Sequence, residues 1–486
     1  MASQVSPGVV LRERDLTNAT IVGDSALTAA IVSSFQKGPI DQIVNIADQK
    51  SLISVFGTPK VANAEDWLVA SEFLGYGGRL AVVRANSADL KNAANGGGIL
   101  IKNDTEWTSG VGNTKIFAAR SAGTWGNGVK VVVVDRGADQ IVTLASAPTT
   151  PPSAGDTMVF NVSGTAKQAE VVEVNGLDYT VVLDDPTVLL SDSDNAEGSV
   201  INGGGNSGAD INIAAVKDAY TNTSIGTTGL KLSAIGPRPG TSQFASDRGV
   251  KYDEVHIGVI DTTGDVSGAA NTVLERFTFL SKISDAKSPE GGSLYYKDII
   301  NDQAQFIFSG AAVGDLFEPN TTGGGKAWGL ASSSLSSGDF FKLSGGNETD
   351  LSGGVDKYDY TAGEVTGGYD LFLDTEETEV DFVLMGGSMG TEADTKTKAQ
   401  KAVAIAAARK DCIAFVSAFK GNQVGSGGSA LTASQQKTKT VNFFNTITST
   451  SYAVLDSGYK YMYDRFNDKY RYVACCLLYT SPSPRD

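Results

Sequence analysis

The sequence predicts a multidomain α/β (α+β) protein. We expect a discontinuous α/β core that is interrupted by an inserted mainly-β domain and preceded by an extended terminal arm. Helical and buried-strand patterns occur in residues 21–90 and again after residue 246, whereas the sequence between them is rich in Thr, Val and Ser with frequent Gly and Pro. A chain of 486 residues is also too long for one ordinary core, so we expect about two to four domains.

The first 20 residues are interpreted as an arm. A turn signal at residues 6–8 precedes the apolar residues Val9, Val10 and Leu11, and four charged residues follow them. A strand this short and this charged cannot bury itself in its own core. It either frays or pairs with a sheet edge on another subunit.

Residues 21–90 are predicted to form the first part of the α/β core. Small and β-branched residues at 29–35 predict a strand, and the apolar run at 80–83 predicts a second, buried one. Between them, residues 48–55 and 64–76 have the apolar spacing of helices.

Residues 91–245 are predicted to form the inserted, mainly-β outer domain. Strands are expected at 116–120 and 129–134. Turn residues then punctuate the segment 136–235 every eight to twelve positions, which is typical of a small all-β module. A helical pattern occurs in this module only around 210–220.

The α/β pattern then resumes in a second core part, residues 246–360, and in a C-terminal domain, residues 361–475. Apolar residues at helical spacing across 273–283 predict a helix. The other predicted elements are strands at 255–260, 305–308, 380–385 and 413–416 and an Ala-rich helix at 396–410.

A β-hairpin with one aromatic face is predicted near the end of the C-terminal domain. Tyrosines alternate with other residues on both sides of a polar turn at 464–468. This period of two places their rings on one face of a two-stranded sheet. The tyrosines are Tyr459, Tyr461, Tyr463, Tyr470 and Tyr472.

The composition excludes several functional classes. Lys and Arg number 39 against 55 Asp and Glu, which gives a net charge of −16, and such an acidic surface repels nucleic-acid phosphates. Three cysteines without zinc-site spacing and a single histidine exclude the usual zinc clusters. We therefore expect no metal, no cofactor and no direct nucleic-acid partner.

Membrane insertion and secretion are not expected either. No stretch approaches the roughly 20 consecutive apolar residues that cross a bilayer. The opening MASQVSPGVV has no basic segment followed by a long apolar one. The sequence therefore predicts a protein that is made and folded in a cytoplasm.

Motifs that could carry catalysis or ligand binding are incomplete. His256 could serve an α/β hydrolase with Asp253 or Asp261, but no Gly-x-Ser-x-Gly nucleophile turn follows a strand, and a structural role in its own strand is the preferred interpretation. The phosphate-loop-like run 323–326 lacks the Ser or Thr that must follow its lysine. The calcium-loop-like run 192–195 lacks the required glycine. We therefore predict no catalytic residues and no enzymatic activity.

Several segments, taken in order over roughly residues 6–474, resemble the tail sheath family of contractile bacteriophages. The strongest is the hairpin run at 459–464 with its turn, whereas residues 136–235 carry little resemblance. The resembling segments are 6–9, 35–39, 56–59, 73–77, 82–85, 123–127, 238–242, 253–254, 259–261, 351–356, 408–411 and 459–471.

The resemblance implies a structural subunit that polymerises around an inner tail tube. Identical subunits would form hexameric rings stacked helically, contact baseplate and tail terminator proteins, and contract to drive the tube through the host envelope. Terminal arms would add strands to sheets of neighbouring subunits. The implied location is the virion tail, assembled in the host cytoplasm. The sheath of a phage-derived bacterial injection device or bacteriocin, an α/β hydrolase using His256, and an adhesin remain alternatives.

The resemblance stops after Cys475. Residues 476–486 read like the translation of a transposase-type sequencing adapter. We interpret them as an assembly artefact on a truncated reading frame, with a natural Ser/Pro tail as the alternative. A sheath protein without its C-terminal arm is expected to fold at least in part and to polymerise poorly.

Overall fold

The computed structural model describes residues 27–475, with gaps at 112–113, 136–138, 149–150, 154, 186–187, 201–209, 311–325, 342–347, 377 and 426–430. The predicted arm, with Val9, Val10 and Leu11, and the segment 476–486 lie outside the described residues. The chain divides into two compact units. The first contains residues 27–90, 102–104 and 356–475, and the second contains 91–101 and 105–355.

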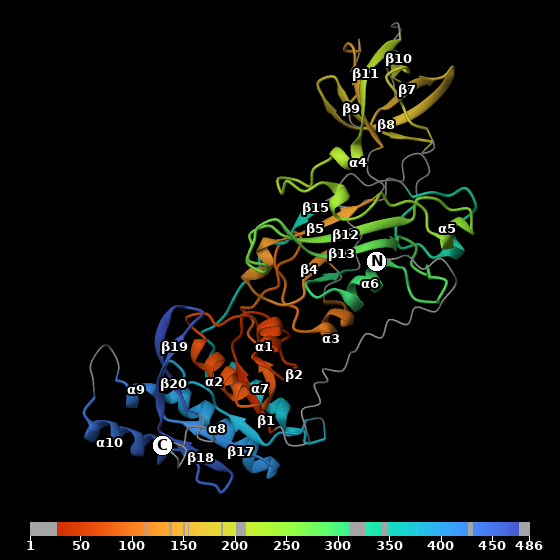
Figure 1. Cartoon of the computed structure of the whole chain (residues 1–486). Helices are drawn as coiled ribbons and strands as arrows, with labels where there is room; N and C mark the ends of the chain where they lie inside the picture. The colour runs from red at the N-terminus through yellow and green to blue at the C-terminus, as the bar shows by residue number, and fades with distance from the viewer. Residues whose placement is uncertain are drawn as a thin grey trace. The chain divides into compact units, whose positions relative to one another are not determined.

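The first unit is built on a six-stranded sheet with helices on both faces (Figure 1). The strand order is β18-β17-β16-β1-β3-β2, and only β2 runs antiparallel to its neighbour. The strands are β1 (Thr28–Ser33), β2 (Ile43–Ile46), β3 (Arg79–Arg84), β16 (Phe382–Leu384), β17 (Ile413–Ser417) and β18 (Ala453–Asp456). The predicted strands of this unit are therefore confirmed.

Apolar side chains on the two faces of this sheet hold the helices. Helices α1 (Gln49–Phe56) and α2 (Ala64–Gly75) bury Phe56, Trp67 and Phe73 against one face. Helices α7 (Ala362–Tyr369) and α8 (Glu392–Arg409) cover the other. The close fit of α7 depends on Gly368, where a Cβ atom would lie 2.6 Å from a methyl group of Val32.

The remaining helices of the first unit are α9 (Lys420–Gln423) and α10 (Ala433–Phe444). The helices predicted at 48–55, 64–76 and 396–410 correspond to α1, α2 and α8. Side-chain capping explains where α8 and α10 begin, because Thr391 and Thr432 each accept a hydrogen bond from a backbone N–H in the first turn.

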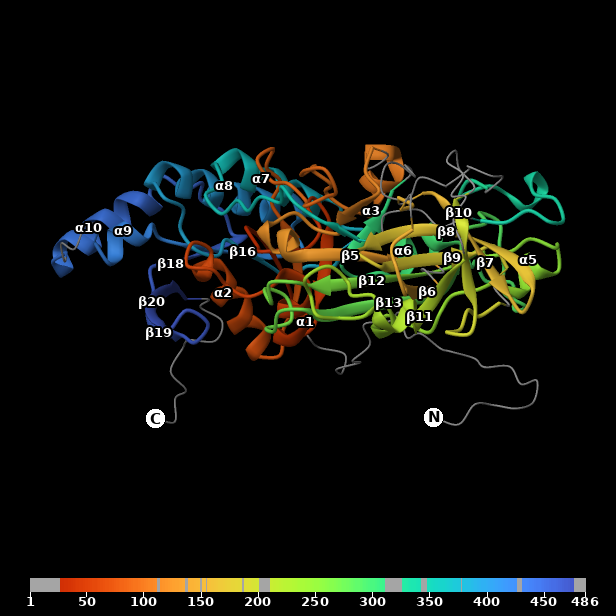
Figure 2. The ribbon, with the colours of Figure 1, turned by 90° about the horizontal axis from the view of Figure 1, so that it is seen from above.

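The second unit contains a four-stranded antiparallel sheet in the order β13-β12-β5-β15, of which β5, β12 and β13 are labelled in Figure 2. A separate two-stranded sheet and helix α6 (Tyr296–Gln303) pack against the same core. The strands are β5 (Val129–Val134), β12 (Glu254–Asp261), β13 (Thr272–Ser281), β15 (Glu348–Asp350), β4 (Phe117–Ala119) and β14 (Ile307–Ser309).

A closed six-stranded barrel is inserted into the second unit between β5 and β12. Its interior is filled by residues such as Phe160, Val171 and Tyr179, so it is a packed core and not a channel. The strands are β6 (Gln140–Leu144), β7 (Thr157–Val162), β8 (Thr165–Asn175), β9 (Asp178–Leu183), β10 (Asn195–Val200) and β11 (Ile211–Asp218). The prediction of a small all-β module is confirmed.

Short helices complete the described chain. They are α3 (Asp104–Glu106), α4 (Ala219–Asn222) and α5 (Gln243–Ser246), 3-10 turns at Thr124–Gly128, Leu232–Ala234, Ser332–Ser334 and Asp370–Leu373, and a π-helical turn at Trp107–Val111.

One arginine joins the two ends of the barrel. Arg238 donates to a carboxylate oxygen of Asp139 at 2.8 Å, where the chain enters the barrel, and to one of Asp218 at 2.6 Å, where it leaves. The same guanidinium lies 5.3 Å from the ring centre of Tyr220. A bidentate arginine of this kind fixes two acidic partners at once, so Arg238 holds both connections of the insertion.

Three sequence-based expectations differ from the structure. Residues 273–283 were predicted as a helix but lie largely in β13, because two register shifts in its pairing with β12 disturb the strict alternation of a strand. The helical pattern around 210–220 is strand β11 followed by one turn of α4. The segment 246–355 belongs with the insertion and not with the first sheet, because β12 pairs with β5.

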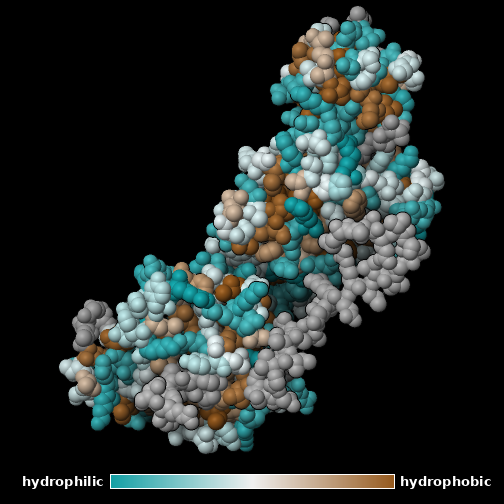
Figure 3. All heavy atoms as spheres, viewed as in Figure 1, coloured by the Kyte–Doolittle hydropathy of each residue, from teal (hydrophilic) through white to brown (hydrophobic). Residues whose placement is uncertain are grey.

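No helix among the described residues is long and apolar enough to span a membrane. On the face shown in Figure 3, hydrophobic residues form separate patches among hydrophilic ones. This mixture is normal for a folded surface in water.

A buried ion pair in the second unit provides a test of its core. The Lys282 Nζ atom lies 2.5 Å from an oxygen of Asp135, and the two side chains are 0% and 3% exposed. Lys282→Met should lower the free energy of unfolding by about 3–5 kcal/mol, because the buried Asp135 carboxylate loses its cation. Urea unfolding followed by tryptophan fluorescence measures this loss.

The double variant Lys282→Met, Asp135→Leu is the matched control. It replaces both charges by apolar groups, so most of the stability should return. A double variant whose loss equals the sum of the two single losses would show that the pair is not coupled.

Candidate functional site: the aromatic hairpin

The predicted hairpin is present as strands β19 (Tyr459–Asp464) and β20 (Lys469–Ala474). Their six residue pairs are in unbroken antiparallel register. Among the described residues, neither strand pairs with a further strand. Each strand therefore offers one outer edge of backbone N–H and C=O groups for pairing.

One face of the hairpin is a row of exposed tyrosines. The side chains of Tyr461, Tyr463, Tyr470 and Tyr472 are between 38% and 62% exposed. The ring centres of Tyr461 and Tyr470 lie 5.2 Å apart with the rings nearly parallel, and Tyr461 and Tyr472 lie 4.8 Å apart. These cross-strand contacts stabilise the hairpin and keep the rings in one layer.

Tyr459 has a different environment from the other four tyrosines. Its ring is half-buried against the core of the first unit, and its hydroxyl donates to the carbonyl of Ala418 at 2.7 Å. Burial raises the pKa of this hydroxyl, so it stays neutral as a donor. Tyr459 thus anchors the start of the hairpin, and the exposed row has four members.

The opposite face of the hairpin packs on helix α2. Val473 is fully buried there, and Met462 packs against the same cluster. At the turn, the ring of Phe466 meets Trp67 edge-on at 5.0 Å, and the Trp67 indole N–H donates to the carbonyl of Gly57 at 3.1 Å. The hairpin is therefore a firmly seated platform with one free face and two free edges.

A buried carboxylate closes the turn of the hairpin. Asp464 is 0% exposed and accepts hydrogen bonds from Nε of Arg471 at 2.9 Å, from the Asn467 amide at 2.8 Å and from the backbone N–H of Phe466 at 3.1 Å. Burial alone would raise the pKa of Asp464, but the hydrogen bonds from Asn467 and Arg471 outweigh it, and the net pKa is lowered.

The sequence reasoning identified the turn but not this role of Asp464. An aspartate at the first position of a turn is the available signal, because its side chain bonds to backbone N–H groups just ahead of it. The turn also places Asp468 at a φ of 50°, a left-handed conformation that Asp tolerates better than most residues. Its carboxylate accepts from the Tyr463 hydroxyl at 2.5 Å.

Other sheet edges in the described chain are shorter or interrupted. Edge strands β2 and β18 have four residues each and β15 has three. Strand β13 has ten, but two register shifts interrupt it. Bulges and short lengths are common protections against unwanted pairing. The hairpin strands thus provide the longest regular free edges among the described residues.

His256 occupies a structural position in β12. Its Nε2 lies 2.5 Å from the carbonyl of Pro237, and its Nδ1 accepts from the backbone N–H of Phe279 at 2.9 Å. Both ring nitrogens are therefore used by neutral backbone groups, which requires the neutral imidazole. Asp253 accepts from Ser242 and Ser281, and Asp261 accepts from backbone N–H groups of its own loop.

The carboxyl end of the first sheet is the usual ligand position in open α/β folds, at the point where strand order reverses. Here that point lies between β1 and β16. The chain's own groups fill it: Asp66 accepts from the Ser33 hydroxyl at 2.5 Å and pairs with Lys398 at 3.2 Å, and Lys398 donates to the carbonyl of Gly387 at 3.1 Å. The crevice is therefore occupied by a structural ion pair.

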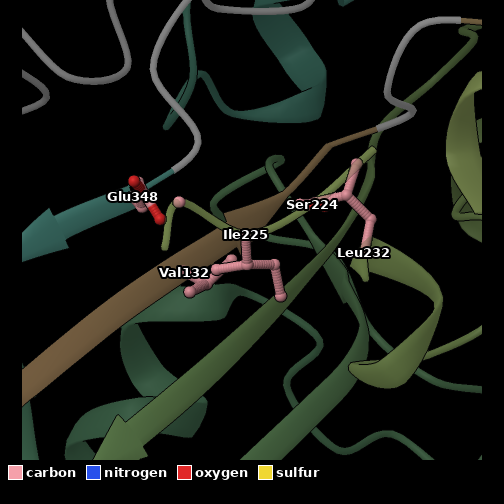
Figure 4. A pocket seen from close by; sticks show the side chains of 6 residues that line it. Val132, Ser224, Ile225, Leu232 and Glu348 are labelled. Atoms are coloured by element: carbon pink, nitrogen blue, oxygen red, sulfur yellow. The ribbon is translucent and has the colours of Figure 1, made fainter. Parts of the chain in front are cut away.

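Two surface hollows among the described residues lie in the second unit and are candidate ligand sites. The first has a volume of about 200 Å³ and is lined by residues that include Val132, Ile225 and Leu232, with Glu348 at its rim (Figure 4). Glu348 is 3.3 Å from Nζ of Lys130. The hollow is smaller than the roughly 300–1,000 Å³ of small-molecule sites.

The second hollow, of about 720 Å³, lies beside β11 at the barrel ends. Two of its polar groups are already engaged within the protein. Arg238 is paired with two aspartates, and Gln140 exchanges hydrogen bonds with the backbone of Leu190. Arg238 and Gln140 therefore serve the fold at this hollow, whose lining also includes Asp192 and Lys217.

The incomplete loop motifs also find ordinary structural roles. In the calcium-like run, Asp194 accepts from the backbone and hydroxyl of Ser191. No group of three metal-binding side chains occurs in the part of the chain that the structure describes. In the phosphate-loop-like run, Lys326 pairs with Asp339 at 3.3 Å, and residues 323–325 lie outside the described residues.

Comparison with curated proteins finds relatives over nearly the whole chain. The tail sheath protein of Salmonella phage ViI is 24% identical over 507 residues, which cover 98% of this chain and 69% of that protein. The tail sheath protein of Enterobacteria phage T4 is 26% identical and covers 96% of this chain and 71% of its own length. That of Vibrio phage KVP40 is 24% identical, with coverages of 96% and 72%.

Comparison with family models finds no match. Among solved structures, a sheath tail protein from Listeria innocua is similar over 93% of this chain and 68% of its own, with 9% identity and a TM-score of 0.34. A sheath tail protein from Desulfitobacterium hafniense is similar over 90% and 61%, with 10% identity and a TM-score of 0.30.

Removing the buried charge in the turn should loosen the hairpin. Asp464→Asn loses the ion pair with Arg471 and should cost about 1–3 kcal/mol of local stability. Because the folded pKa of Asp464 is lowered, its contribution is present above the unfolded pKa of about 3.9 and is lost as the pH falls through the folded value. Hydrogen exchange of the hairpin amides measures this loss, and Asp468→Asn, at an exposed carboxylate of the same turn, is the control.

His256 gives a second pH-dependent prediction. Burial lowers its pKa, so the folded state binds fewer protons than the unfolded state and stability falls as the pH drops below about 6.5. Since the chain has one histidine, His256→Asn should flatten the unfolding free energy between pH 7 and pH 5. An unchanged slope, or a hydrolytic activity that this variant abolishes, would contradict the structural role.

Proposed function

Since the chain belongs to the phage tail sheath protein family, we propose that it polymerises around an inner tail tube as hexameric rings stacked helically and contracts to drive the tube through the host envelope. It is a structural subunit of the sheath. We further propose that it works without catalytic residues and without a cofactor.

The observation that carries the assembly part of the proposal is the hairpin β19–β20. Its two regular outer edges lie on a platform that is fixed to the core by Val473, Phe466 and the closed turn at Asp464. An extended segment of another subunit that pairs with such an edge gains a row of backbone hydrogen bonds. We propose that these edges receive strands from neighbouring copies of the chain.

The predicted arm supplies a strand for this purpose. Val9, Val10 and Leu11 are β-branched or apolar residues with charged residues after them. Inserted beside β19 or β20, the arm would extend the two-stranded sheet, and a partner subunit would supply the pairing that a short strand lacks on its own. The arm therefore acts as a tether that keeps subunits connected while they move.

Contraction requires no chemistry at an active site. We propose that its energy is the difference between two packings of the same subunits, the extended one being metastable. The filled crevice at Asp66 and Lys398 and the engaged nitrogens of His256 favour this reading over the α/β hydrolase alternative.

The proposed partners are identical subunits, the inner tube protein, and baseplate and tail terminator proteins, with no direct nucleic-acid contact and no membrane insertion. The proposed location is the virion tail, after assembly in the host cytoplasm. A bacterial contractile injection device would use the same subunit mechanism. The three relatives that cover nearly the whole chain come from phages and favour the phage tail.

A substitution in the arm tests the tether. Val10→Pro removes a backbone N–H donor and fixes the backbone angle, so a strand can no longer form there. We expect this variant to remain folded by circular dichroism and to form fewer striated tubes than the unmodified chain in negative-stain microscopy. Val10→Thr keeps a β-branched side chain and should assemble like the unmodified chain. Normal tubes from Val10→Pro would refute the proposed role of the arm.

A further inference from the structure

The two faces of the hairpin differ in chemistry, and so do the two faces of the arm. We propose that Arg12 and Arg14 from the arm of a second copy stack on the exposed tyrosine face, and that this contact sets which way round the arm is seated. The proposal rests on the proposed function, because it requires the arm to pair with the hairpin.

The arm sequence separates its side chains into two sets. Successive side chains of a strand point to opposite faces. In an extended arm, one face carries the side chains at 9, 11 and 13, which are Val, Leu and Glu. The other face carries those at 10, 12 and 14, which are Val, Arg and Arg. A paired arm must therefore present both arginines to the same face of the hairpin.

The tyrosine face suits these arginines. The exposed side chains of the strands on that face are those of four tyrosines. Neighbouring ring centres lie about one strand spacing apart. An added strand lies about 4.8 Å from its neighbour, which brings a guanidinium within reach of the rings. The attraction of a cation to an aromatic face operates within about 6 Å of the ring centre, and the planar guanidinium can also stack.

The opposite face offers the arginines no comparable partner. In the strands it carries Lys469, Lys460, which is paired with Glu72 of helix α2, and Arg471, which is paired with the buried Asp464 of the same face. Met462 and Val473 on this face pack against the core. The carboxylates of Glu72 and Asp464 are thus already paired, and an added arginine beside Lys469 would place like charges on neighbouring strands, which is destabilising. The other arm face, with Val9, Leu11 and Glu13, offers apolar contacts and one carboxylate to the same surface.

This argument holds for both outer edges of the hairpin. Strand β19 contributes Tyr461 and Tyr463 to the exposed face, and strand β20 contributes Tyr470 and Tyr472. An arm that pairs with either strand therefore meets two tyrosines on one side and, on the other, the face that packs on α2, whose Lys460 and Arg471 are already ion-paired. The tyrosine face thus acts as a determinant of register for the incoming strand, since a slip by one residue reverses its faces.

The test compares the concentration at which the full chain begins to assemble, measured by sedimentation. Arg12→Gln with Arg14→Gln should raise this concentration by roughly 5- to 30-fold, from the loss of two cation–aromatic contacts. Arg12→Lys with Arg14→Lys keeps the charge but not the planar group and should give a smaller increase. Tyr461→Leu with Tyr470→Leu should act like the Gln variant, whereas Tyr461→Phe with Tyr470→Phe should match the unmodified chain.

Combining the two sets of changes shows whether they report one contact. A variant with both the Gln and the Leu substitutions should be no worse than either set alone. Losses that multiply, or Gln variants that assemble like the unmodified chain, would overturn the proposal. If Val10→Pro blocks assembly while the Gln variant does not, only the arginine–tyrosine contact fails. If Val10→Pro itself assembles normally, the proposed tether fails first.

A mixed-isotope experiment identifies the copy that supplies the arm. A photoreactive phenylalanine analogue replaces Val10 in both a ¹⁴N and a ¹⁵N preparation, and the two are mixed before assembly and irradiation. Cross-links between light and heavy chains at the hairpin are expected. Cross-links that occur only within light or within heavy chains would show that each hairpin binds its own arm, and would refute the second copy as the occupant.

Discussion

A strand at the edge of a sheet carries a row of N–H and C=O groups that its own sheet leaves unpaired. The sheets of this protein differ mainly in whether such edges are closed, interrupted, short or left open for pairing. The barrel closes on itself through the pairing of β10 with β7. Strand β13 is interrupted by two register shifts, and β15 has three residues, with Glu348 and Asp350 at its ends. Only the hairpin among the described sheets keeps long, regular edges open, and it is also braced by the buried Asp464. Because the other described edges pair poorly with an added strand, the two outer edges of the hairpin give the protein a defined place for association.

The nested arrangement of the chain depends on a few polar contacts at the points where it passes from one part to the next. Arg238 fixes both ends of the barrel through Asp139 and Asp218, so the barrel is held by its connections as well as by its core. The same arginine begins the segment 238–242 that resembles sheath proteins, whereas the barrel that it holds resembles them little. This contrast has a physical reason: Arg238 must match two acidic partners at the connections, while the interior of the barrel packs on itself. An insertion held in this way can vary in sequence without disturbing the rest of the second unit.

The sequence was sufficient to predict an element where a single local pattern, either helical apolar spacing or strict strand alternation, determined its structure. Strands β1 and β3, helices α1, α2 and α8, and the tyrosine hairpin follow directly from apolar spacing and strict alternation. It was insufficient where an extra residue breaks the alternation, as in β13, whose bulges give its apolar residues a spacing that imitates a helix. It also could not assign residues 246–355 to the second unit, since the pairing of β12 with β5 joins residues more than a hundred positions apart. In the hairpin, the tyrosine row was predictable, but the separate burial of Tyr459 and the buried turn carboxylate depend on helix α2 and the core beneath.

The charge of the chain adds a condition on how copies of it can associate. At a net charge of −16, copies repel one another at long range, but salt at physiological strength screens such repulsion beyond about 8 Å. Association must then be decided by groups in direct contact. The hairpin, residues 459–474, has four cationic residues (Lys460, Arg465, Lys469 and Arg471) and two acidic ones (Asp464 and Asp468), an excess of two positive charges (4 − 2 = 2), one of which, Lys460, is paired with Glu72 of helix α2. A locally positive platform on an acidic subunit reduces repulsion at the point of contact, and it favours strands that bring apolar or acidic side chains to the face that carries Lys469. Backbone pairing supplies the affinity in this scheme, and the distribution of charge about the hairpin selects the strand and its orientation.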